Sequence, residues 1–152
     1  MAPESYPLII AHYELPNHVT RTEHWSLVAL VDRKIGHVME IAGNSNSYTY
    51  VPRQIRRFSQ SKNLRGGYLV GFIPADQIKK LEDSLRQVPV VRYDPSFDCQ
   101  TWILDALRFI KTERPGCITE DTRESTIRRE LNEEKERWNT GEDTVEERLF
   151  PS

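Results

Sequence analysis

The sequence contains few cysteines: only Cys99 and Cys117 occur among its 152 residues. The two lack the close paired spacing of a zinc site, and they are too few to define a disulfide framework. A reducing, cytoplasmic compartment is therefore the expected location. We expect no metal ion and no other cofactor.

Long apolar runs are also missing. No stretch approaches the roughly 18–20 apolar residues that are needed to cross a bilayer. Residues 1–5 do not combine a basic region with a long apolar run, as a secretory signal does. We therefore expect a soluble protein without a stable membrane anchor.

An excess of charge of one sign is absent as well, since the formal net charge is −2. The charges are nevertheless unevenly spread, because the chain beyond Thr119 is rich in glutamate and an earlier segment is basic. We interpret both as solvated faces, or as faces that pair with each other, and we expect no nucleic-acid partner. The expected partner is a small-molecule substrate. The basic segment comprises Arg53, Arg56, Arg57, Lys62 and Arg65.

The length fits one domain with a modest core. We expect an α+β domain over residues 1–118 and a charged peripheral helix and tail of the same domain over residues 119–152. Asp121 and Glu124 have the spacing of a capping box for that helix, and Gly141 is expected to end it. The tail after Gly141 is expected to be frayed.

Apolar and β-branched runs predict an antiparallel sheet, and a three- to four-residue apolar period predicts helices. Gly71 interrupts the last predicted strand, where it allows a ligand or a neighbouring backbone to come close. The predicted strands span residues 7–15, 24–31, 35–42, 48–51 and 68–73, and a helix is predicted over residues 74–87.

A second predicted helix begins near Cys99, with Ser96 or Asp98 as its N-cap, and ends at Pro115-Gly116. Cys99 lies one turn before Ile103, on the apolar side of the first turn. The helix dipole and the unpaired N–H groups there favour a thiolate. The alternative is a buried cysteine that packs as a small hydrophobic residue. The apolar face consists of Trp102, Ile103, Ala106, Leu107 and Ile110.

Polar residues interrupt the hairpin predicted over residues 24–42. In an antiparallel pair the start of one strand lies beside the end of the next, so His24 and Glu40 are expected to be neighbours. His37 has the opposite parity to Glu40 and should face the other side of the sheet. A thiol nucleophile needs a base and a group that orients the base, and Cys99, His24 and Glu40 supply these three chemistries. His12 and His18 are interpreted as polar surface or strand positions.

Three segments together resemble a known superfamily: His24-Trp25-Ser26-Leu27, residues 36–42 (Gly-His-Val-Met-Glu-Ile-Ala), and Asp98-Cys99-Gln100-Thr101-Trp102. They look like the circularly permuted papain-like fold of lecithin:retinol acyltransferase-like and NlpC/P60-related proteins, in which the histidine strand precedes the cysteine helix. Small uncharacterised fungal proteins are similar in the same region. The resemblance implies an antiparallel sheet packed against a cysteine-bearing helix.

By this resemblance Cys99 is the nucleophile, His24 is the base, and Glu40 takes the place of a polar third residue that is usually histidine. Asp98 stands where the family typically has asparagine, and its charge opposes the helix dipole. The charged C-terminal end differs from the apolar span of the membrane-anchored acyltransferases, which makes phospholipids a less favoured substrate class. The residues expected to contact substrate are Trp25, Gln100, Trp102 and Tyr68.

Three functions are compatible with these patterns. The first is a soluble cysteine-dependent hydrolase or acyltransferase that acts on an ester, thioester or amide. The second is a non-covalent isomerase or cyclase, such as a pericyclase, that uses the same cleft to hold a reactive conformer. The third is a catalytically silent interaction module that docks through the acidic terminal helix.

Overall fold

The computed structural model describes residues 4–14 and 23–151 as one α+β arrangement. Its strands are β1 (Ser5–Glu14), β2 (Glu23–Leu30), β3 (Gly36–Ala42), β4 (Thr49–Ile55) and β5 (Leu64–Pro74). Its helices are α1 (Ile78–Ser84), α2 (Cys99–Glu113), α3 (Glu124–Thr140) and α4 (Val145–Leu149), with short 3₁₀ turns at η1 (Phe58–Gln60), η2 (Ala75–Gln77) and η3 (Leu85–Gln87). None of the helices in this part of the chain is long and apolar enough to cross a membrane.

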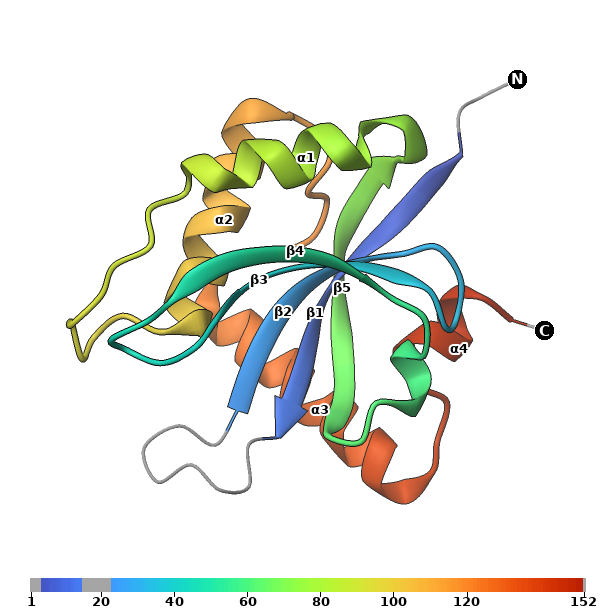
Figure 1. Ribbon diagram of the computed structural model, residues 1–152. Helices are drawn as coiled ribbons and strands as arrows, with labels where there is room; N and C mark the ends of the chain where they lie inside the picture. The colour runs from blue at the N-terminus through green and yellow to red at the C-terminus, as the bar shows by residue number, and fades with distance from the viewer. Residues whose placement is uncertain (1–3, 15–22, 152) are drawn as a thin grey trace.

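The strands form one five-stranded antiparallel sheet in the order β4-β3-β2-β1-β5 (Figure 1). The antiparallel sheet was predicted. The pairing of neighbouring strands explains where the strands end. β4 extends to Ile55 although it contains Pro52, because it is an edge strand and a missing N–H is tolerated there. The predicted end of the first strand at Leu15 and the predicted polar position His18 lie outside the described residues.

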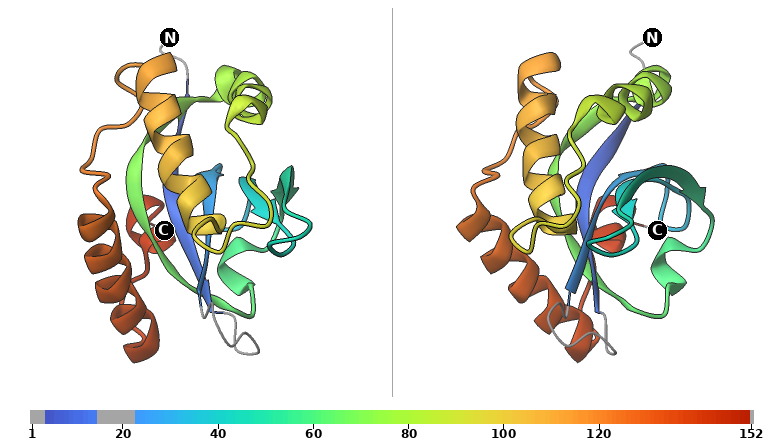
Figure 2. Two further views of the ribbon diagram at one scale, coloured as in Figure 1. Left: turned by 90° about the vertical axis from the view of Figure 1, so that its left-hand side faces the viewer. Right: turned by 60° about the vertical axis from the view of Figure 1, so that its left-hand side comes forward.

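Alternation along the strands gives the sheet two buried faces. Leu8 and Ile10 of β1 point into a large cluster with α1, α2 and α3, whereas Ile9 and Ala11 point into a smaller one with η1 and α4. Figure 2 shows α2 and α3 along one side of the sheet. This two-sided burial explains why Leu8–Ala11 of β1 and Leu27–Leu30 of β2 are continuously apolar and do not alternate with polar residues.

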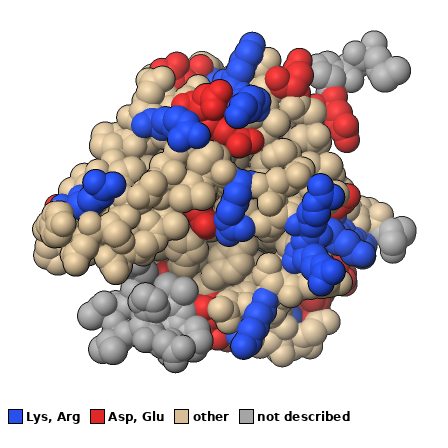
Figure 3. Space-filling model, in the orientation of Figure 1, with Lys and Arg blue, Asp and Glu red and all other residues tan. Residues whose placement is uncertain are grey.

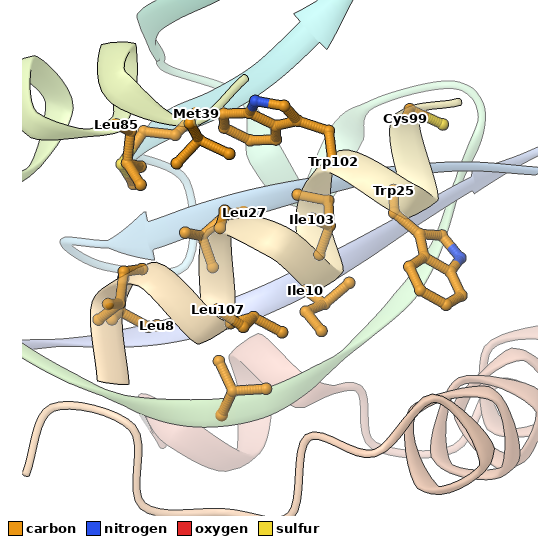
Figure 4. Packing of buried hydrophobic residues seen from close by; sticks show 14 of the residues in the cluster. Leu8, Ile10, Trp25, Leu27, Met39, Leu85, Cys99, Trp102, Ile103 and Leu107 are labelled. Carbon is orange, nitrogen blue, oxygen red and sulfur yellow. The ribbon is translucent and has the colours of Figure 1, made fainter. Parts of the chain in front are cut away.

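Helix α2 lies over the large cluster as its apolar period predicts. Ile103 and Leu107 lie toward Leu27 and Ile10 of the sheet, Trp102 lies toward Met39, and Cys99 is at the beginning of the helix (Figure 4). Of the two predicted N-caps, Asp98 is the one used: its carboxylate accepts from the N–H groups of Gln100 and Thr101. Cap and apolar face together therefore set where the cysteine helix begins.

The helix within residues 119–152 differs from expectation at its start and agrees with it at its end. The N-cap is Arg123 without a side-chain cap, so the capping box of Asp121 and Glu124 was wrong; Asp121 instead binds the Arg123 N–H and the Thr126 hydroxyl. Gly141 does end α3, in the left-handed conformation expected of a C-cap glycine.

The tail is not frayed, because residues 145–149 form α4 against the smaller core. Val145 is buried there, and its N–H donates to the buried Glu134 carboxylate of α3 over 2.7 Å. Arg148 binds the same carboxylate at 2.9 Å. These long-range contacts lie between polar residues, which is why an apolar period could not reveal them.

Charges on the surface are largely mixed. Two members of the basic segment form ion pairs, Arg53 with Glu40 and Arg65 with Glu14. On the face in Figure 3, acidic and basic side chains mix along the top, and a group of Lys and Arg gathers on the right. Both glutamates precede the glutamate-rich region beyond Thr119, so these two ion pairs do not join the two charged segments to each other.

Gly71 allows a neighbouring backbone segment to come close, which is one of the two roles expected of it. A Cβ at this position would lie 1.8 Å from the Cys117 carbonyl oxygen. The same carbonyl accepts from the Phe72 N–H at 2.8 Å, and the Thr119 N–H donates to the Val70 carbonyl at 2.9 Å. The segment after α2 is therefore bound to the edge of β5.

Substituting Gly71→Ala is expected to lower the free energy of unfolding by about 2 kcal/mol, because the added methyl group must displace backbone. Urea denaturation measures the change. Gly116→Ala is the control: its added Cβ meets no atom within 4 Å, so only its left-handed backbone is strained, at a cost of about 1 kcal/mol. Equal losses in the two variants would contradict the close approach.

Candidate active site

Three elements bring the candidate residues together. His24 is on β2, Glu40 is on β3, and Cys99 is the first residue of α2. The ladder between β2 and β3 runs from Leu30–Gly36 to Leu27–Met39. Glu40 follows Met39, so it lies just beyond the last paired residues of the hairpin, next to the part of β2 that carries His24.

The predicted proximity of His24 and Glu40 is confirmed. His24 Nε2 lies 2.9 Å from Glu40 Oε1. The buried Ser26 hydroxyl donates to the same oxygen, and Arg53 of β4 donates to Oε2 over 3.2 Å. The carboxylate thus has partners on both oxygens. His37, as its parity predicts, faces the other way and lies 3.5 Å from Glu82 of the opposite layer.

These partners keep Glu40 ionised although it is buried. Burial by itself favours the neutral acid, but the hydrogen bonds from His24 and Ser26, with the charges of His24 and Arg53, lower the pKa of Glu40 below its ordinary value. A carboxylate that stays ionised beside an imidazole orients the ring and stabilises its protonated form.

His24 connects Glu40 to the cysteine. Burial opposes protonation of the ring, but hydrogen bonds with Cys99 and Glu40 and the charges of both groups outweigh it and raise the pKa of His24 to about 9. Because Glu40 occupies Nε2, Nδ1 is the ring nitrogen left for the sulfur. At neutral pH this arrangement holds a protonated His24 between the Cys99 sulfur and the Glu40 carboxylate.

The sulfur is at the helix N-terminus but not at the surface. Cys99 is 1 % exposed and belongs to the large core cluster. Both readings of this residue, nucleophile and packed core cysteine, therefore retain a structural basis. As the first residue of α2, Cys99 has a backbone N–H with no partner within the helix. Both cysteines are free.

The residues predicted to contact substrate fall into two groups. Trp25 and Gln100 lie beside the cysteine end of α2, where Arg128 stacks on the Trp25 ring at 5.0 Å and binds the Gln100 side chain. Trp102 is fully buried and stacks on Tyr50 at 5.3 Å, and Tyr68 donates its hydroxyl to the Asp121 carbonyl. The contacts of Trp102 and Tyr68 are thus with β4 and with the segment before α3.

A pocket of about 150 Å³ lies beside the Trp25 and Arg128 pair. Its wall is formed by Glu23, Trp25, Arg128, Leu131 and Asn132. Within the described residues, no group of three or more His, Cys, Asp and Glu side chains is arranged to hold a metal ion.

Sequence reasoning missed several residues around the site. Ser26 follows His24 with the same strand parity, so alternation was a usable signal for its contact with Glu40. Arg53 and Arg128 come from β4 and α3, and only the tertiary structure reveals them. His12 occupies a strand position, one of the two expected for it; it is buried, with Nε2 2.7 Å from a carboxylate oxygen of Glu23, because β1 is covered on both faces.

A family model described as a family of unknown function (DUF6540) matches residues 10–114. The matched region runs from within β1 to the end of α2 and includes His24, Glu40 and Cys99. It stops before α3. No curated protein and no solved structure matches the chain.

Titration of His24 is expected to appear in the stability of the protein. The pKa of His24 is near 9 in the folded state and ordinarily about 6.5, so its contribution is complete below pH 6.5 and is lost as the pH rises through 9. Between pH 6.5 and 9.5 we expect the free energy of unfolding to fall by roughly 2 kcal/mol more than in a His24→Gln variant.

Urea denaturation across this pH range provides the measurement. The lowered pKa of Glu40 acts only in acid, where protonation removes its contribution, so it does not disturb this window. His37→Gln, on the other side of the sheet, should keep the dependence of the unchanged protein. A His24→Gln variant with the same pH dependence as the unchanged protein would contradict the assignment.

Proposed function

The chain belongs to the DUF6540 family, and we propose that it is a cysteine-dependent hydrolase or acyltransferase acting on an ester, thioester or amide. The observation that carries this proposal is the position of His24, which is hydrogen-bonded to Cys99 on one side and to the ionised Glu40 on the other. A nucleophile, a base and an orienting group in this order are the arrangement that activates a thiol. A permuted papain-like fold is part of the same proposal.

The first chemical step is attack of the Cys99 thiolate on the substrate carbonyl carbon. A C–S bond forms, and the carbonyl electron pair moves to oxygen as an oxyanion. The Cys99 N–H at the helix start is the proposed donor to that oxyanion. When the carbonyl re-forms, the leaving alcohol, thiol or amine takes the proton of the His24 imidazolium, and an acyl-cysteine remains.

In the second step the neutral His24 removes a proton from water or from an acceptor alcohol or amine. The resulting oxygen or nitrogen attacks the acyl-cysteine, the C–S bond breaks, and the thiolate returns beside the imidazolium. Glu40 remains ionised throughout and keeps the ring oriented through Nε2. No redox partner is required in this cycle.

The burial of Cys99 supports a second candidate. A sulfur that substrate cannot reach would leave non-covalent catalysis, with an isomerase or cyclase using the pocket beside Trp25 and Arg128. The two candidates differ in their dependence on the sulfur: Cys99→Ser abolishes turnover in the first and spares it in the second.

The proposed pair is tested by alkylation with iodoacetamide, a reagent small enough for a tight site. A Cys117→Ser background leaves Cys99 as the sole thiol. At pH 7 we expect alkylation to be at least about tenfold slower when His24 is changed to Ala, because the imidazolium no longer holds a thiolate. Rates from pH 6 to pH 10, measured by mass spectrometry, give the profile.

His37→Ala is the matched control, because it removes a histidine from β3 without touching Glu40. Its profile should coincide with that of the Cys117→Ser background. If His24→Ala left the whole profile unchanged, the thiol would not be paired with the imidazole, and the covalent mechanism would be rejected.

A further inference from the structure

Helix α3 lies outside the region that matches the family, yet it reaches the residues beside the candidate active site. Arg128 donates from Nη2 to the Gln100 side-chain oxygen over 2.8 Å. Gln100 in turn donates from Nε2 to the backbone carbonyl of Glu23 over 3.2 Å. A continuous path of hydrogen bonds therefore connects α3 to α2 and then to β2.

The two ends of the Gln100 contact are each next to a candidate catalytic residue. Gln100 directly follows Cys99, and Glu23 directly precedes His24. The hydrogen bond between them therefore joins the first turn of the nucleophile's helix to the strand that carries the base. It restricts sliding of α2 against β2 at the point where the sulfur must meet the imidazole.

Arg128 determines which way the Gln100 amide points. An amide has one acceptor and one donor end, and a guanidinium only donates. With the oxygen held by Arg128, the NH₂ group must face the Glu23 carbonyl. Without the guanidinium, a flipped amide would place oxygen against oxygen and break the link.

The guanidinium itself is well oriented. Its Nε binds Glu124 one turn earlier on α3 at 3.0 Å, and its Cζ lies over the Trp25 ring, 5.0 Å from the ring centroid. Such a cation–π contact together with several hydrogen bonds uses the planar fork of arginine, which lysine lacks. Arg128 thus presents a fixed donor to Gln100.

We propose that Arg128 is a positioning residue that acts through Gln100 to hold the Cys99 helix in register with the His24 strand. This inference rests on the proposed cysteine mechanism, and it makes the charged C-terminal helix a part of the active site. Arg128 acts on the geometry of the Cys99 and His24 pair and does not contact the reacting atoms.

The test uses the Cys117→Ser background with Arg128→Met, Gln100→Met and the double variant, each followed by iodoacetamide alkylation from pH 6 to pH 10. Methionine keeps the length of either side chain and removes its hydrogen bonds. At pH 7 we expect each single variant to react about tenfold more slowly, as misplacement of reacting groups does. At pH 10, above the usual range of cysteine ionisation, the rates should converge.

The double variant should be no slower than Gln100→Met alone, because both changes break one path. Arg129→Met is the control on the same helix; Arg129 is 63 % exposed and forms an ion pair with the adjacent Glu130, and its variant should keep the background rate. A role confined to folding would give the opposite sign, since opening the buried site speeds alkylation at every pH.

The outcomes separate the inference from the function on which it rests. If His24→Ala slows alkylation and Arg128→Met does not, the positioning role is wrong and the cysteine mechanism stands. Faster alkylation of Arg128→Met at all pH values, or additive losses in the double variant, also overturns the positioning role. If His24→Ala has no effect, the mechanism itself is rejected.

Discussion

The arrangement of the site depends on one buried carboxylate. Glu40 is held among an imidazole, a hydroxyl and a guanidinium that come from two neighbouring strands. A charge taken out of water without such partners would be strongly destabilising. The same contacts that keep Glu40 ionised determine the orientation of His24, and the orientation of His24 determines what the thiol of Cys99 meets.

Around this carboxylate the fold supplies a rigid support. β2 is paired with β1 along its length, α2 is capped by Asp98, and the apolar face of α2 packs on both strands. The position of Cys99 is therefore set by a cap, a core and a strand at once. A site on such elements is held more firmly than one on loops.

The C-terminal region has a different relation to the domain. Its helix α3 shares only a thin apolar stripe with the large core, through Ile127 and Leu131, and the rest of its surface is charged. Polar contacts largely determine how α3 is placed against its neighbours. The Glu134 carboxylate accepts from the Val145 N–H of α4, and Arg128 donates to the Gln100 side chain of α2. Polar contacts depend on distance and direction, which suits them to fix register more than to add stability.

The sequence by itself determined the elements whose signal is local. The apolar period of α2, its Asp98 cap, the strands on either side of residue 32, and the neighbourhood of His24 and Glu40 all follow from spacing and parity over short distances. Tertiary structure alone decided the contacts of Arg53, Arg128 and Glu134 and the formation of α4, because each depends on which polar group comes to lie near a given charged side chain, and neither spacing nor parity specifies that. Periodicity predicts which face of an element is buried, but no local pattern predicts the partner of a charged side chain.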